Sequence, residues 1–298
     1  EQAIKDVEVS GSVVYRYDNF HNKEKKDSFG NVTSDRQNTD VNRYKIGLNL
    51  SSKVNDYVKF NSRFIVGSQD NGGFSSLNSK KTSNGAANAN ADGQADVSLS
   101  NAYFGFTAIP NTVVNIGKQG LTTPYTVAVD INGNEQTGTG ILALSTFGPV
   151  TAGLGYFNNT NLNASSEINL TQGLGLDTFP NGANGVINGG QDVYVATVQG
   201  DLDFVKLEAW YLGHQENFNS YTLAATSNID LAENAKIGLE ARYVNLSLTN
   251  DGRNALANTL TGGILTGADF EKKNEMFRFA VDGKFSIVNA RLAYTMTG

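Results

Sequence analysis

The stretch that decides the fold is VEVSGSVVYRYD, residues 7–18. Every second residue of this stretch is large and apolar or aromatic, apart from one glycine, namely Val7, Val9, Val13, Tyr15 and Tyr17. The residues between them are mostly small, polar or charged, including Glu8, Ser10, Ser12, Arg16 and Asp18. Because successive side chains of a β-strand point to opposite faces, this period of two predicts a strand with one apolar and one polar face.

The same alternation recurs along the chain and predicts roughly thirteen strands of about ten residues each. They are expected at 7–19, 42–52, 57–68, 96–109, 112–121, 139–147, 149–158, 192–201, 203–214, 220–231, 235–248, 275–287 and 289–296. About ten residues is the length with which a tilted strand crosses a lipid bilayer.

The predicted connections alternate between short and long. The short ones lie at 54–56, 110–111, 148–149, 200–202, 231–234 and near 288–289. The long ones, at 21–41, 69–95, 159–191 and 249–274, are rich in Asn, Gly, Ser, Thr and Asp. Tight turns at one rim and long loops at the other are typical of an outer-membrane barrel. Since no change in composition marks a boundary, we expect residues 1–298 to form one domain.

Composition excludes several classes of protein. No run of eighteen apolar residues occurs, which excludes a membrane protein built from helices. The absence of Cys excludes disulfides and thiolate metal sites. A formal net charge of −6 disfavours a nucleic-acid partner, which needs a basic face. An all-β chain with many turns remains, in keeping with 32 Gly and only 4 Pro.

A soluble β-sandwich or β-helix would also show alternation, with the apolar residues packed inward. Three features favour the membrane barrel instead. The strands are longer than those of most soluble sheets. Tyr and Phe gather at strand ends, where the interface girdles of a barrel lie. The polar faces carry acidic and basic groups together.

Several strand motifs carry a resemblance to a known family. They are AIKDVEVSG (3–11) followed by YRYD (15–18), GKQ (117–119), AVD (128–130) followed by GTG (138–140), AWYLG (209–213) and ARYVNLSL (241–248). Together they resemble the major outer membrane porin of the Campylobacter type. The similarity extends over the whole chain, is clear at the strands and is weak in the loops.

The resemblance implies an antiparallel transmembrane barrel of about sixteen to eighteen strands in the complete family. It further implies a homotrimer in the outer membrane of a Gram-negative bacterium that lets ions and small hydrophilic solutes pass. The chain departs from the pattern because it ends at Met296-Thr297-Gly298, without the usual terminal aromatic residue. With an odd number of predicted strands as well, we expect further strands beyond Gly298, because an open barrel edge is unstable in lipid.

Charges on the polar faces are the candidate pore-lining residues, because such charges set the selectivity of a pore. The predicted basic members are Arg16, Arg43, Lys45, Lys59, Arg63, Lys118, Lys206, Arg242, Arg278, Lys284 and Arg291, and the acidic ones are Asp18, Glu208, Glu240 and Asp282, with Glu8 also on a polar face. Simple solvation of a water-filled wall would explain each of them equally well. The ion preference of the pore therefore stays open.

Residues 122–140 are the predicted constriction segment. Asp130, Asn132 and Asn134 alternate like the start of a calcium loop, but a glycine at position 133 and Ile141 at the twelfth position rule out an EF-hand. The resemblance places Asp130 beside the constriction and Glu167 near a second acidic position. A structural Ca²⁺ could be held between them, although an ordinary acidic loop explains the motif too. No other cofactor is expected.

The alternatives to a pore are a barrel hydrolase and a surface adhesin or antigen. A barrel hydrolase would need a positioned base, and the only histidines, His21 and His214, have no nucleophile motif or metal-ligand spacing beside them. We therefore expect no enzyme activity. A surface adhesin or antigen would use the exposed loops, whose composition does not distinguish it from a porin. Conductance in a planar bilayer would separate the two.

Overall fold

The computed structural model describes residues 5–34, 37–67, 73–76, 80–81, 87–88, 96–130, 133–162, 189–261 and 263–298. Thirteen strands form its main antiparallel sheet: β1 (Lys5–Asn22), β4 (Gln37–Lys53), β5 (Val58–Gly67), β9 (Asp96–Phe106), β10 (Thr112–Gly120), β11 (Thr137–Phe147), β12 (Val150–Thr160), β13 (Val193–Leu202), β14 (Val205–His214), β15 (Phe218–Ala232), β16 (Ala235–Leu248), β17 (Lys273–Phe285) and β18 (Val288–Thr297). A short strand, β6 (Ser75–Ser76), pairs with β4.

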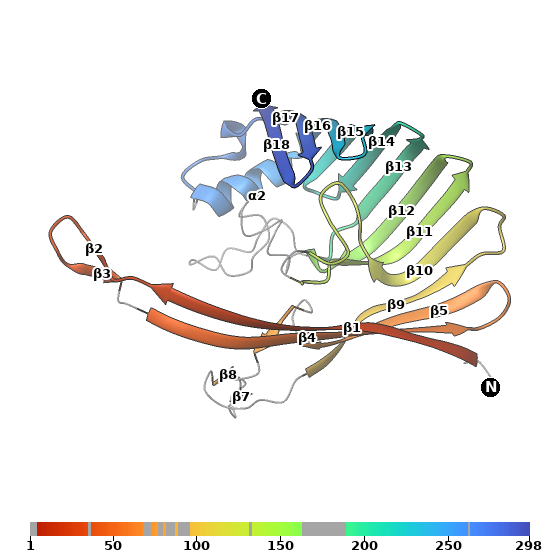
Figure 1. Cartoon of the computed structure of the whole chain (residues 1–298), viewed down its shortest axis with the longest axis horizontal. Helices are drawn as coiled ribbons and strands as arrows, with labels where there is room; N and C mark the ends of the chain where they lie inside the picture. Colours follow the sequence, from red (N-terminus) through yellow and green to blue (C-terminus); the bar gives the residue numbers. More distant parts are fainter. Residues whose placement is uncertain are drawn as a thin grey trace.

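Each of the thirteen strands pairs with its neighbours in chain order, from β1 at one edge to β18 at the other. The sheet curls into a wide arc, and its two edge strands do not meet within the described residues (Figure 1). The short turns lie together at one rim of the arc and the long connections at the other, except for the short turn 215–217 between β14 and β15, which shares the rim of the long connections. This architecture is that of an antiparallel transmembrane β-barrel, as the alternation predicts.

The register shows that the two faces differ in polarity. One cross-strand row runs Val198, Ala209, Leu223, Tyr243, Phe277 and Met296. The adjacent row, on the opposite face, runs Gln199, Glu208, Ala224, Arg242, Arg278 and Thr295. The first row is apolar and faces outward, with Val198 and Leu223 each 55% exposed. The second row faces the inside of the arc.

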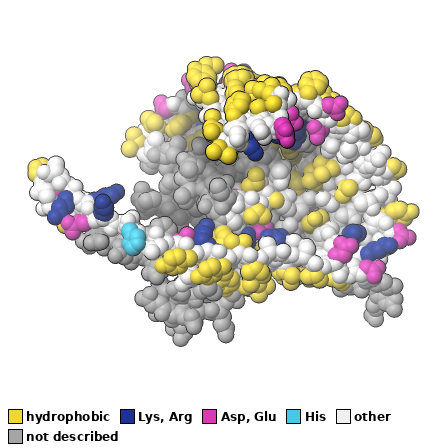
Figure 2. All heavy atoms as spheres, viewed as in Figure 1, with side chains coloured by type: hydrophobic (Ala, Val, Ile, Leu, Met, Phe, Trp, Pro, Cys, Tyr) yellow, Lys and Arg dark blue, Asp and Glu magenta, His cyan; other side chains and the backbone are white. Residues whose placement is uncertain are grey.

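Apolar side chains are exposed on the outer face over the whole sheet. Leu48 on β4 is 39% exposed and Phe279 on β17 is 43% exposed, so neither lies in a packed interior. Figure 2 shows hydrophobic side chains gathered along the outside of the arc, around a hollow interior. This arrangement contradicts a soluble sandwich, in which the same residues would be buried between two sheets.

All thirteen predicted strands are confirmed, and their ends shift by a few residues at most, except in β1 and β4, which extend several residues further at the long-loop rim. The predicted loops contain short elements that the alternation does not reveal. A hairpin of β2 (Lys25–Lys26) and β3 (Val32–Ser34) lies in loop 21–41, and β7 (Lys80–Lys81) pairs with β8 (Ala87–Asn88) in loop 69–95.

Loop 249–274 holds a helix, α2 (Asn250–Thr261), and a 3-10 turn, η2 (Gly267–Asp269). Thr249 caps the helix, because its hydroxyl accepts a hydrogen bond from the Gly252 backbone N–H at 3.0 Å. Within the described ranges, no helix has the length and apolar character required to cross a membrane.

Candidate functional site

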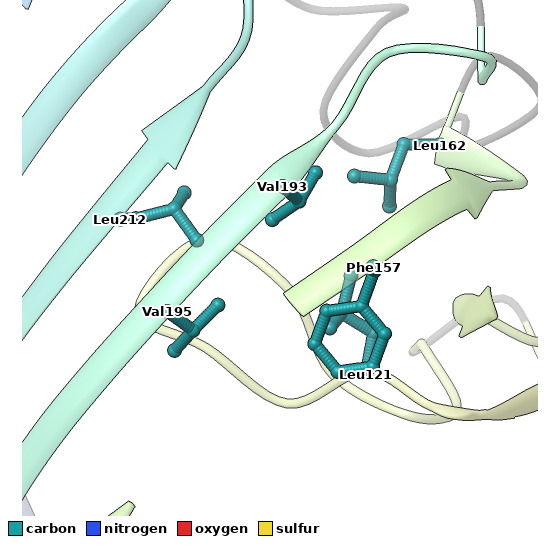
Figure 3. Close-up of a cluster of buried hydrophobic side chains, with 6 residues drawn as sticks. All are labelled: Leu121, Phe157, Leu162, Val193, Val195 and Leu212. Carbon is teal, nitrogen blue, oxygen red and sulfur yellow. The ribbon is translucent and has the colours of Figure 1, made fainter. Parts of the chain in front are cut away.

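The connection between β10 and β11 folds into the arc instead of extending away from it (Figure 1). We call its described residues, 121–130 and 133–136, the inner loop. Leu121 at its start is 3% exposed and joins a buried apolar cluster on the inner wall (Figure 3). The other members are Phe157, Leu162, Val193, Val195 and Leu212. The inner faces of β12, β13 and β14 are therefore apolar where protein covers them, which favours docking of the loop.

Glu135 anchors the far end of the inner loop to the wall formed by β4 and β5. Its carboxylate accepts hydrogen bonds from Lys45 Nζ at 2.8 Å and from Arg63 Nη2 at 3.0 Å. The Ser100 hydroxyl donates a third, at 3.1 Å. Glu135 is 4% exposed and Lys45 is 6% exposed, so the ion pair is buried. Lys45 also donates to the Gly133 carbonyl oxygen in the same loop.

The electrostatics of this anchor keep Glu135 charged. Burial by itself raises the pKa of the Glu135 carboxyl, but the hydrogen bonds from Arg63 and Lys45, together with their positive charges, outweigh it and hold the pKa below its ordinary value. The stability that this pairing contributes is therefore present above the ordinary carboxyl pKa and is lost as the pH falls through the lowered value. At neutral pH the anchor is fully formed.

Tyr125 anchors the middle of the loop to a different part of the sheet. Its hydroxyl lies 2.5 Å from the Ser220 hydroxyl on β15, and its ring meets the Phe218 ring edge-on, with 5.8 Å between centroids. Burial raises the pKa of the Tyr125 phenol, so the hydroxyl stays protonated. The inner loop thus runs across the hollow from β4 and β5 to β15. That residues 122–140 constrict a passage stays a prediction.

Asp130 shapes the inner loop locally. Its carboxylate accepts hydrogen bonds from the Asn134 backbone N–H at 2.8 Å and from Asn134 Nδ2 at 3.0 Å. Its backbone carbonyl accepts from the Gly133 N–H at 2.9 Å, and Gly133 has a φ of +82°, which favours glycine. Asp130 therefore closes a tight turn and is 5% exposed.

The predicted calcium site is only partly visible. Glu167, its second predicted ligand, lies outside the described residues. Over the described ranges, no group of three or more His, Cys, Asp or Glu side chains comes together to hold a metal. Since both Asp130 oxygens already accept hydrogen bonds from Asn134, the described residues do not by themselves build the oxygen cage that Ca²⁺ needs.

The other predicted pore-lining charges fall mostly into clusters on the inner face. On β1 and β4, Asp18 lies 3.1 Å from Arg16 and 3.6 Å from Arg43. On β14, Lys206 lies 3.8 Å from Glu208. The remaining cluster spans β16 to β18 and contains Glu240, Arg242, Arg278, Asp282 and Arg291.

Three predicted residues stand apart from these clusters. Lys59 lines a cavity of about 340 Å³ near the short-turn rim, with Asn61 and Tyr103. Lys284 lies opposite Lys236 in the register of β16 and β17. Lys118 departs from the predicted orientation. In the register it pairs with Ala102, and it lies two residues after the outward-facing Ile116, so it is on the outward face of β10. Its ammonium group donates to the Leu99 carbonyl oxygen at 3.2 Å.

His214 has a packing role at the rim end of β14. It is 3% exposed, its ring stacks on Phe218, and its Nδ1 lies 2.8 Å from Asn217 Nδ2. Among the described residues, no serine or threonine hydroxyl is hydrogen-bonded to the ring. The geometry around His214 therefore does not support the hydrolase hypothesis.

The model of the Campylobacter major outer membrane protein family matches residues 1–283. Among curated proteins, no sequence matches the chain.

Solved structures with a similar fold include OccK8, OccAB1 and OprD. OccK8 (OprE) from Pseudomonas aeruginosa aligns with a TM-score of 0.64 at 14% identity, over 99% of this chain and 69% of that one. OccAB1 from Acinetobacter baumannii aligns with a TM-score of 0.62 at 15% identity, over 97% of this chain and 65% of that one. The outer membrane protein OprD from P. aeruginosa aligns with a TM-score of 0.62 at 12% identity, over 99% of this chain and 58% of that one. At these identities the likeness shows the fold alone, and the chain spans about two thirds of their length or less.

Proposed function

The chain belongs to the Campylobacter major outer membrane protein family, and from that premise we propose that it works as a porin, a passive channel for ions and small hydrophilic solutes. Its place is the bacterial outer membrane, with lipid against the apolar outer face. We further propose that the charges on the inner face line the water-filled passage and that the inner loop narrows it.

One observation carries this proposal above the others. The inner loop is pinned inside the arc by a buried ion pair, Glu135 with Lys45 and Arg63, whose partners lie on two different strands. A loop used only as a surface antigen has no need of a buried anchor on the inner wall. A channel does need one, because a fixed loop sets the width of the passage.

Conductance across a planar lipid bilayer tests the proposal. We expect stepwise insertions, each with a current proportional to voltage, from protein whose gel mobility changes on heating as folded barrels do. Folded protein that inserts without conducting would reject the channel and favour the adhesin or antigen alternative.

Assembly as a homotrimer is a second part of the proposal. It is supported by the resemblance to the family and by the broad apolar outer face that a neighbouring copy could cover. A native mass equal to three chains would support it, and the mass of a single chain would reject it.

A further inference from the structure

Two arginines face each other directly on the inner wall. Arg242 on β16 and Arg278 on β17 are register partners, so their side chains project from the same face of adjacent strands. Like charges placed directly opposite each other destabilise a strand pair unless an anion lies between them. This pair therefore points to a counter-ion, and the neighbouring carboxylates are the first candidates.

Glu240 meets only part of this need. Its Oε1 lies 3.4 Å from Arg242 Nε and 4.0 Å from Arg278 Nε, while its Oε2 accepts from Arg291 Nη2 at 3.1 Å. One carboxylate thus serves three guanidinium groups. Asp282 is paired with Arg291, at 3.3 Å. On the same inner row, Glu208 lies nearest to Lys206.

The terminal nitrogens of both arginines remain available. In the part of the chain that the structure describes, no acceptor is hydrogen-bonded to the Nη atoms of Arg242 or Arg278. Arg278 Nε is itself buried without a hydrogen-bond partner. A guanidinium group presents its donors as a planar fork that matches the two oxygens of a carboxylate. Two such forks side by side form a site for an external anion.

A niche beside Arg242 indicates the chemical character of the rest of this anion. The inner loop and the wall border an open groove with a volume of about 470 Å³. Pro124 and Tyr125 line it from the loop, and Thr222, Arg242, Val244 and Leu246 line it from the wall, together with residues 274–276 and 297–298. Five of the lining side chains are apolar or aromatic, namely Pro124, Tyr125, Val244, Leu246 and Met276, and four are polar, namely Thr222, Asn274, Glu275 and Thr297.

Glu275 also lines this niche, but its carboxylate is bound on the outward row. It accepts hydrogen bonds from the Tyr243 hydroxyl at 3.0 Å and from Asn245 Nδ2 at 3.2 Å. It therefore does not compete for the Arg242 guanidinium group.

We propose that Arg242 and Arg278 form a binding site for the carboxylate of small solutes whose apolar part occupies this niche. The inference rests on the proposed channel function and names a class of solute that the passage retains. The planar carboxylate fits the paired forks, and an apolar body fits the Tyr125 side of the niche better than a sugar would.

Block of the ion current by phenylacetate tests the site, with the uncharged phenylacetamide as the matched probe. Added to the full chain in a planar bilayer at low salt, phenylacetate should reduce the current and phenylacetamide should not. In the double variant R242Q/R278Q the block should weaken by about ten-fold or more, because charge-assisted hydrogen bonds are lost. R242K/R278K should give an intermediate block, since lysine keeps the charge and loses the fork.

Lys236→Gln provides the control. Lys236 lies on β16 in the same inward register as Arg242, but it pairs with Asp230 at 3.1 Å near the short-turn rim. Its loss should leave the phenylacetate block unchanged, so a general loss of positive charge is separated from loss of the site.

The outcomes separate this inference from the channel itself. Equal block by the acid and the amide, or an unchanged block in R242Q/R278Q, would overturn the site and leave the channel standing. A wild-type chain that does not conduct would overturn both. If the double variant does not fold, the binding of phenylacetate to the wild-type protein in detergent is measured by calorimetry. The absence of binding heat, or binding heat that acetate does not reduce, would refute the site.

Discussion

Glu135→Gln is expected to free the inner loop, raise the single-channel current and make it noisier. The change leaves Lys45 and Arg63 as buried positive charges without their carboxylate. Removing one partner of a buried ion pair costs about 3–5 kcal/mol of folding free energy. The anchor fails first, because the loop can leave the wall while the sheet stays intact. Conductance measures the width of the passage, and denaturant unfolding in lipid vesicles measures the stability.

Asp56→Asn is the matched control for this variant. Asp56 pairs with Lys53 at 2.9 Å in the turn between β4 and β5, and its side chain is 84% exposed. An exposed pair of this kind contributes little to stability, because solvent screens the attraction between its charges. The control should therefore conduct and unfold like the wild type. A Glu135→Gln protein that behaves like the control would contradict the anchoring role.

Val198→Arg should lower stability in lipid by about 2–4 kcal/mol, the cost of a charged side chain on the lipid-facing side near the middle of a barrel. Val198 lies in the middle of β13 and is 55% exposed on the outward row. An arginine there would have to be buried among acyl chains or bend toward the interface. Unfolding titrations in vesicles measure the difference from the wild type.

Gln199→Arg tests the adjacent residue of the same strand. Gln199 faces inward and lies opposite Glu208 in the register, so a new guanidinium group would meet water and a carboxylate. We expect its cost to stay below about 1 kcal/mol, as for other exposed charges. Similar losses for the two arginine variants would remove the distinction between the faces.

The strands and their faces could be predicted from the sequence because alternation is a local signal. The stretch 7–18 shows its strand within twelve residues, and the same holds for the other twelve strands. Short turns are local as well. Lys118 is charged but lies at an outward position of the period-two pattern, so its charge alone does not predict its face. Asn115 and Gln119 on the same strand set the inward positions, and Lys118 falls between them.

The anchors of the inner loop could not be predicted, because their partners are distant in the chain. Glu135 meets Lys45 and Arg63 at separations of 90 and 72 residues. Phe157, Val193 and Val195 face inward and are covered by protein, not by water, and no local pattern in the sequence predicts this. The sequence of helix α2, NDGRNALANTLT, does not predict a helix, because it is largely polar and only the cap Thr249 and the acidic Asp251 signal its start.

A scan of single cysteines along β13 tests most directly whether the outer face meets lipid and the inner face meets water. The chain has no native cysteine, so each label reports one position. From Tyr194 to Leu202, we expect a water-soluble thiol reagent and a lipid-soluble quencher to give opposite period-two patterns. The quencher should reach Tyr194, Ala196 and Val198, and the thiol reagent should reach Thr197 less readily than Gln199, because Thr197 is buried. Equal access of both probes to adjacent positions, without alternation, would contradict the account.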